Sequence, residues 1–93
     1  MELTPETVVR AARDQVSTEV EGEAVILGLA DEVYYGLDGA GALVWSLLAE
    51  PRTLAELRDA VVAAYEVDAG TAERDLARLL DELRERRLVE VVS

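Results

Sequence analysis

The feature that most limits the fold of this chain is a change in its hydrophobic period at Asp38. Before Asp38, apolar and polar residues alternate with a period of two, as in a strand that turns one face toward a core. After Asp38, apolar residues recur every three or four positions, which indicates amphipathic helices. We therefore expect strands in the first part of the chain and helices in the second.

The alternating part predicts three strands, which cover residues 15–20, 24–29 and 32–37. The connections at residues 21–23 and 30–31 are so short that neighbouring strands must run antiparallel. In the third strand Val33, Tyr35 and Leu37 share one face, and Glu32, Tyr34 and Gly36 share the other. Residues 3–13 are compatible with an extended arm or with a helical turn.

The second part predicts three helices, which cover residues 38–50, 53–65 and 69–87, followed by a short strand at 88–92. Asp38 and Asp68 are suited to N-cap positions, and Thr53 with Glu56 forms a capping box. The expected fold is a single domain over residues 1–93. Its class is α+β and winged-helix-like, with an N-terminal three-stranded antiparallel sheet followed by three helices.

Composition excludes several functions. The chain has no Cys and no His, so thiol and imidazole catalysis and the usual zinc ligands are absent, and we expect no enzyme activity, cofactor or metal. Net charge is −11 and there is no Lys, which argues against nucleic-acid binding. No apolar run approaches the ~20 residues of a membrane span, and no secretory signal is visible at the N-terminus, so we expect a cytoplasmic protein.

The outer edge of the third strand is the feature most suited to binding. Edge strands are usually protected by charge or Pro, but this one carries only Glu32 and two adjacent aromatic residues. An extended peptide could pair with its backbone, with pockets for alternate side chains. The third helix would form the other wall, and we expect its flank of Asp75, Leu79 and Glu82 to face the peptide.

Each of these residues also has a structural interpretation. Tyr34 and Tyr35 are typical strand residues and could simply fill the two faces of the sheet. Asp75 could be a solvated acid on a helix surface. Trp45 lies beside a regular apolar stripe, which favours a place in the core.

Three segments carry a family resemblance: residues 22–27 (Gly-Glu-Ala-Val-Ile-Leu), residues 33–45 (Val-Tyr-Tyr-Gly-Leu-Asp-Gly-Ala-Gly-Ala-Leu-Val-Trp) and the series Asp75-Leu76, Leu79-Leu80, Leu83. In this order and spacing they resemble the PqqD-like family, also called the RiPP recognition element. RiPPs are ribosomally made, post-translationally modified peptides. The aromatic strand, the small residues 39–42 and the acidic, Arg-rich helices look most like the stand-alone version from lasso-peptide gene clusters.

The resemblance implies binding of a precursor's leader peptide by strand addition, with a leader Tyr and Pro as anchors. The residues it implies for leader binding are Val33, Tyr34, Tyr35 and Gly36 on the strand, and Asp75, Leu79 and Glu82 on the helix. The implied partners are a papain-like cysteine protease that removes the leader and, indirectly, an ATP-dependent lasso cyclase. The resemblance implies no nucleic-acid or membrane partner.

Three alternative functions differ in the partner or residues that each would require. A peptide chaperone of pyrroloquinoline quinone biosynthesis would have a radical-SAM enzyme as its partner. A winged-helix DNA-binding protein would share the topology, but the acidic surface of this chain would repel a DNA duplex. A carboxylate enzyme would need a spaced pair of acids in a pocket, and no such pair is recognisable in the sequence.

Overall fold

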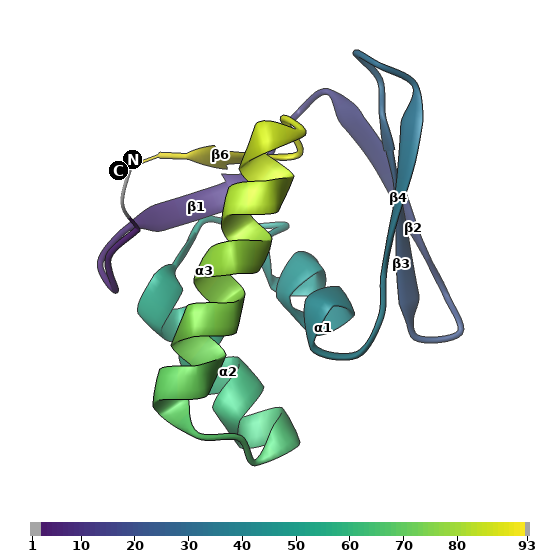
Figure 1. Ribbon diagram of the computed structural model, residues 1–93. Helices are drawn as coiled ribbons and strands as arrows, with labels where there is room; N and C mark the ends of the chain where they lie inside the picture. Colours follow the sequence, from purple (N-terminus) through teal and green to yellow (C-terminus); the bar gives the residue numbers. More distant parts are fainter. Residues whose placement is uncertain (1–2, 93) are drawn as a thin grey trace.

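The computed structural model describes residues 3–92, which form two small sheets and three helices (Figure 1). In chain order the elements are β1 (Val8–Ala11), β2 (Gln15–Val20), β3 (Glu23–Gly28), β4 (Val33–Leu37), α1 (Gly39–Leu47), β5 (Arg52–Thr53), α2 (Leu54–Tyr65), α3 (Ala69–Glu85) and β6 (Val89–Val91). The expected α+β class is confirmed, and so is the antiparallel meander that precedes the three helices.

The meander has the strand order β2-β3-β4, and its register assigns a face to every side chain. Ser17, Ile26 and Tyr35 lie side by side on the inner face, where Ile26 is fully buried. Val16, Leu27 and Tyr34 form the adjacent row and therefore lie on the outer face. The β2–β3 hairpin turns at Glu21 (φ 50°) and Gly22 (φ 82°), the two positive φ values of a type I′ turn.

The N-terminal segment forms a strand of a second sheet, with the order β5-β1-β6. Both β5 and β6 run antiparallel to β1, and Val9 pairs with Val91 and is buried. Arg10 forms an ion pair of 3.1 Å with Glu90 across this sheet. The local sequence pattern leaves residues 3–13 open between an arm and a helical turn and does not predict β5, because these pairings join positions far apart in the chain.

Helix starts follow the local signals closely. Thr53 accepts a hydrogen bond from the backbone N–H of Glu56, and Glu56 accepts one from the backbone N–H of Thr53, so the capping box is confirmed. Asp68 caps α3 by accepting from the N–H of Thr71. Asp38 occupies the N-cap position of α1, but its side chain makes no capping hydrogen bond, and α1 ends earlier than expected, at Leu47.

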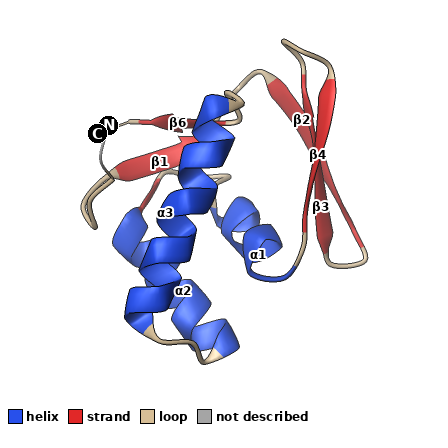
Figure 2. Cartoon of the chain, viewed as in Figure 1, coloured by secondary structure: helices blue, strands red, loops and turns tan. Residues whose placement is uncertain are grey.

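The three helices lie on the same side of the meander (Figure 2), and one core joins them to its inner face. Its members are apolar side chains from both sheets and all three helices, including Val9, Ile26, Val44, Trp45, Leu57, Leu80 and Leu83. Trp45 is buried in this core, which confirms its structural interpretation. Among residues 3–92, no helix has the length and apolar character needed to cross a bilayer.

Candidate functional site

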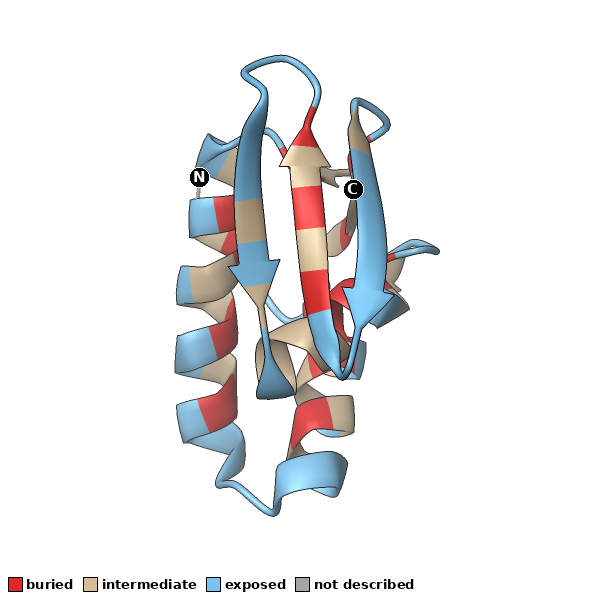
Figure 3. Cartoon of the chain, turned by 90° about the vertical axis from the view of Figure 1, so that its right-hand side faces the viewer, coloured by how far each residue is buried: buried red, intermediate tan, exposed pale blue. Residues whose placement is uncertain are grey.

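Strand β4 is an edge strand, and within residues 3–92 it pairs only with β3. The N-terminal segment could have covered this edge, but it runs into the other sheet as β1. Helix α3 lies beside β4 along the same side of the molecule (Figure 3). The free edge of β4 therefore lies on the side of the sheet along which α3 runs.

Tyr35 bridges β4 and the C-terminal end of α3. Its hydroxyl donates a hydrogen bond to the carboxylate of Glu82, and the guanidinium of Arg86 lies 5.0 Å from the centroid of its ring. Burial, this hydrogen bond and the charge of Glu82 raise the pKa of Tyr35, and the positive charge of Arg86 partly opposes them. The result is a polar contact between β4 and the C-terminal end of α3.

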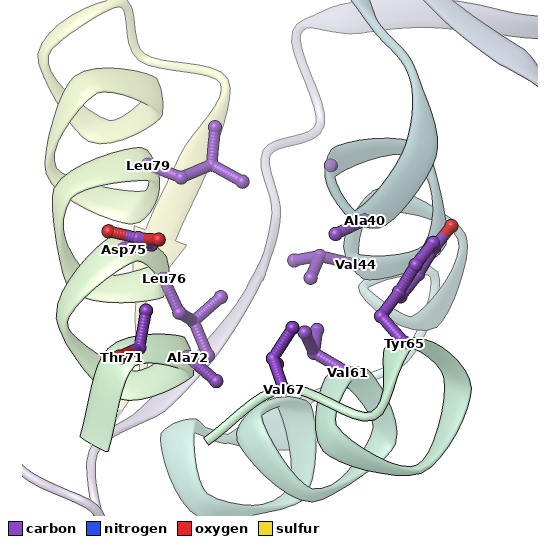
Figure 4. A pocket seen from close by; sticks show the side chains of 11 residues that line it. Ala40, Val44, Val61, Tyr65, Val67, Thr71, Ala72, Asp75, Leu76 and Leu79 are labelled. Carbon is purple, nitrogen blue, oxygen red and sulfur yellow. The ribbon is translucent and has the colours of Figure 1, made fainter. Parts of the chain in front are cut away.

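Toward the N-terminal half of α3 an apolar pocket of about 420 Å³ opens between α3, α1 and the end of α2 (Figure 4). Leu76 and Leu79 point into it from α3, and Ala40 and Val44 face them from α1. The remaining lining residues are Gly41, Val61, Tyr65, Val67, Thr71, Ala72 and Asp75. Such a pocket is suited to an apolar side chain of a ligand.

Small residues at the start of α1 make this pocket possible. Gly39 has a φ of 51°, a conformation that suits glycine and turns the chain sharply from β4 into α1. A Cβ atom on Gly41 would lie 3.2 Å from Cδ2 of Leu37, so the first turn of α1 packs tightly against the end of β4. Ala40 and Gly41 leave room in the pocket that larger side chains would fill.

The two flanks of α3 have different surroundings. Leu80 is 1% exposed, and on the same flank Glu73 forms an ion pair of 3.5 Å with Arg58 of α2. On the other flank Leu79 is only half-buried, and Asp75 and Glu82 are exposed. The flank packed on α2 is thus unavailable to a ligand, and the flank of Asp75, Leu79 and Glu82 faces the pocket and Tyr35.

The structure groups the predicted site residues into four sets. Tyr35 and Glu82 contact each other, whereas Asp75 and Leu79 line the pocket. Tyr34 is 70% exposed on the outer face of the sheet and does not face α3. Val33 and Gly36 are exposed along β4. As the alternation of the sequence predicts, Tyr34 and Tyr35 lie on opposite faces of β4, although both belong to its free edge.

Several lining residues had no place in the predicted site. Val44, Val61, Tyr65 and Val67 come from α1, α2 and the connection to α3, and no local pattern in the sequence marks them as neighbours. Arg86 could have been found from its spacing, because it lies four residues after Glu82 on the same helix face.

The opposite edge of the meander, strand β2, borders a different surface. The neighbouring hollow has a volume of about 260 Å³ and includes Gln15, Ser17, Glu19 and Ser46. These residues and Thr18 make half of its lining polar or charged, and the other half is apolar (Ala11, Ala24, Ala42, Trp45 and Ala49), whereas the pocket beside α3 is lined almost entirely by apolar groups. Of the two free edges, β4 is therefore the better suited to a peptide with apolar side chains.

Comparison with solved structures gives three close matches. TbiB1, in complex with the TbiA(beta) leader peptide, is 38% identical, with a TM-score of 0.84, covering 90% of this chain and 98% of TbiB1. A lasso peptide synthetase B1 complexed with its leader peptide is 24% identical, with a TM-score of 0.78 and coverage of 88% and 96%. The PqqD part of Methylobacterium extorquens PqqCD, a stand-alone RiPP recognition element, is 23% identical, with a TM-score of 0.76 and coverage of 96% and 95%.

The two weaker matches share the fold, and TbiB1 is similar in sequence as well. No curated protein sequence matches the chain. The family model described as coenzyme PQQ synthesis protein D (PqqD) matches residues 23–89, from the start of β3 to the start of β6. This stretch contains β4, α1 and α3, the elements that build the site. The chain belongs to the PqqD family.

Proposed function

We propose that this protein binds the leader segment of a ribosomal precursor peptide in lasso-peptide biosynthesis. The observation that carries the proposal is the free edge of β4 beside an apolar pocket on α3. The likeness to TbiB1, whose structure holds the TbiA(beta) leader peptide, supports the same role here. The role is binding rather than catalysis.

The leader would add to β4 as a further strand. Backbone hydrogen bonds to β4 would fix its register, and alternate side chains would point toward α3. An apolar leader side chain would enter the pocket between Leu79 and Val44. Asp75 is exposed and lines the pocket, so its carboxylate can accept a hydrogen bond from the leader at the rim.

The leader-bound protein would then deliver the precursor to its processing enzymes in the cytoplasm. These are a papain-like cysteine protease that removes the leader and, indirectly, an ATP-dependent lasso cyclase. A leader Tyr and Pro are the anchors that we propose for the groove, because both have rigid, largely apolar side chains suited to such a surface.

Calorimetry with the cognate leader tests the proposal. We expect a dissociation constant of about a micromolar or tighter for a leader of about 10 to 20 residues. Leu79→Asp would place a charge in the apolar pocket, and Tyr35→Ala would remove the bridge between β4 and α3; both should weaken binding. Val92→Asp is the matched control, because Val92 is exposed and distant from the groove, and the net charge changes equally.

A second measurement tests strand addition itself. In an added strand, successive backbone N–H groups point alternately toward β4 and away from it. N-methylation along the leader should therefore abolish binding at every second position and spare the positions between. Failure of the unmodified leader to bind, or an effect without this alternation, would contradict the proposed mode.

A PqqD-type peptide chaperone in pyrroloquinoline quinone biosynthesis is the second candidate. The matching family model is favourable to it, since that model describes the PQQ synthesis protein D. Competition between the two precursor leaders for this protein separates the candidates. Stronger binding of the PQQ precursor, with binding of its radical-SAM enzyme, would replace the lasso assignment.

A further inference from the structure

Basic side chains gather at one place on this acidic protein. A hollow of about 420 Å³ opens where the C-terminal end of α3 meets the β1–β2 connection and the β3–β4 turn. Four of the nine Arg residues of the chain line it, and we call it the arginine hollow; they are Arg13, Arg84, Arg86 and Arg87. Arg84 is half-buried and forms an ion pair of 2.8 Å with Asp81, whereas the other three are exposed. Guanidinium groups bind carboxylates through paired hydrogen bonds, so the hollow fits acidic side chains of a ligand.

The carboxylates of the arginine hollow are partly engaged by the protein itself. They belong to Asp14, Asp31 and Glu90. Glu90 forms the ion pair of 3.1 Å with Arg10, and Asp31 accepts a hydrogen bond of 3.3 Å from the backbone N–H of Val33. The hollow thus holds four basic and three acidic residues in a chain whose net charge is −11.

Arg87 occupies a position at which the backbone favours glycine. Its φ is 61°, and it directly follows Arg86, the residue that ends α3. The backbone N–H of Leu88 donates to the carbonyl of Leu83, and that of Arg87 donates to the carbonyl of Arg84, both at 2.9 Å. Helix ends with this pair of hydrogen bonds usually have glycine where Arg87 stands. An arginine kept there at a cost in backbone strain points to a use for its charge.

The arginine hollow and the apolar pocket lie at opposite ends of β4. Asp31 and Arg86, which line the hollow, also border a small cavity with Val33 at the start of β4. Ala40, which lines the apolar pocket, follows the end of β4 at Leu37. Because β4 has five residues, about five residues of extended chain separate the two sites. One strand added along β4 would therefore reach both.

We propose that the arginine hollow binds acidic side chains of the precursor peptide, about five to ten residues along the chain from the apolar side chain in the pocket. This inference rests on the proposed leader-binding function and adds a charge requirement to it. Both contacts belong to one peptide, so the second forms at a high effective concentration and adds affinity, although an exposed ion pair alone is weak. A peptide with Lys or Arg at these positions would be repelled, which makes the hollow a source of selectivity.

The test compares two synthetic peptides. One is the cognate leader; in the other, the amide leader, every Asp and Glu beyond the segment that the N-methylation scan assigns to β4 is replaced by Asn or Gln. The hollow variant of the full chain is Arg13→Gln with Arg87→Gln. The matched control is Arg74→Gln with Arg78→Gln, because both residues are exposed on α3 and the net charge changes equally. Calorimetry measures the affinity of each protein for each peptide at low and high salt.

We expect the wild type to bind the amide leader about fivefold more weakly than the cognate leader, as the loss of one or two exposed ion pairs predicts. The hollow variant should bind the two peptides equally, whereas the control variant should keep the difference. Added salt should weaken binding of the cognate leader more than binding of the amide leader.

Arg87→Gly separates this role from a structural one. Glycine relieves the backbone strain, so the midpoint of thermal unfolding should rise by about 4 °C. Affinity for the cognate leader should nevertheless fall by about two- to threefold. A more stable variant that binds the cognate leader as tightly as the wild type would overturn the role of Arg87.

Equal binding of the cognate and amide leaders by the wild type, or a preference for the acidic peptide that persists in the hollow variant, would overturn the arginine hollow while leaving leader binding intact. A cognate precursor without an acidic residue in the stated range would also overturn it. Failure of the wild type to bind the cognate leader at either salt concentration would instead reject the proposed function itself.

Discussion

The guanidinium of Arg86 lies 5.0 Å from the centroid of the Tyr35 ring, which links the C-terminal end of α3 to the edge strand β4. Glu82, one turn earlier on α3, accepts the hydrogen bond from the Tyr35 hydroxyl. These contacts join β4 to the C-terminal end of α3, whereas the apolar pocket lies beside the N-terminal half of α3. A bound peptide would therefore find its apolar site at the N-terminal half of α3.

The raised pKa of Tyr35 gives a prediction at alkaline pH. Because the folded-state pKa lies above the unfolded value of 10.0, the folded protein holds this proton more firmly. The contribution to stability is complete below pH 10.0 and is lost as the pH rises through the folded-state pKa. Urea denaturation from neutral to alkaline pH should show a smaller loss of stability for Tyr35→Phe than for the wild type.

Two matched variants check the cause of that shift. Glu82→Gln removes the negative charge beside the phenol and should bring the pKa of Tyr35 closer to its ordinary value, whereas Arg86→Ala should raise it further. Ultraviolet absorbance of the tyrosinate measures both, with Tyr35→Phe identifying the signal among the three Tyr residues. If neither variant changed the pKa of Tyr35, the contacts of Tyr35 with Glu82 and Arg86 would be contradicted.

Adjacent leucines on α3 should separate stability from binding. Leu80 is 1% exposed in the core, so Leu80→Ala should lower the free energy of unfolding by about 2–5 kcal/mol. Leu79 is half-buried at the pocket, so Leu79→Ala should cost less stability but weaken leader binding more. Chemical denaturation and leader titration of both variants check these expectations. If Leu80→Ala weakened leader binding more than Leu79→Ala, Leu79 would not belong to the binding site.

The capping box at the start of α2 gives a prediction at acid pH. Hydrogen bonds from the backbone and side chain of Thr53 lower the pKa of Glu56, so its contribution to stability is present above the unfolded pKa and is lost as the pH falls through the folded-state pKa. Thr53→Ala should cost about 1 kcal/mol at neutral pH. The free energy of unfolding of Glu56→Gln should depend less on acid pH than that of the wild type. An equal dependence in both proteins would mean that other carboxylates cause the loss of stability at acid pH.

Two glycines of the meander provide a test of backbone conformation. An added Cβ has no atom within 4 Å at either Gly22 or Gly36, but Gly22 has a φ of 82°. Gly22→Ala should therefore destabilise the protein by about 1–2 kcal/mol through backbone strain. Gly36→Ala, whose backbone has no such φ, should be neutral or slightly stabilising. Thermal unfolding of both variants checks the difference, and equal effects would refute the strained turn.

Local signals in the sequence were sufficient for the elements that form within a few residues. The alternation before Asp38 predicts the three strands of the meander, and the capping residues Thr53 and Asp68 predict where α2 and α3 begin. These features depend on neighbours within one turn of helix or one hairpin, so the order of residues alone determines them.

Only the tertiary structure decides which remote segments meet. The pairing of Val9 with Val91 builds the second sheet and draws the N-terminal segment away from the edge of β4. The contact of Tyr35 with Arg86, the pocket between α1 and α3, and the outward direction of Val16 and Tyr34 also depend on how distant elements pack. A period of two separates the faces of a strand, but the helices determine which face becomes the inner one, because burying that face against them removes it from water.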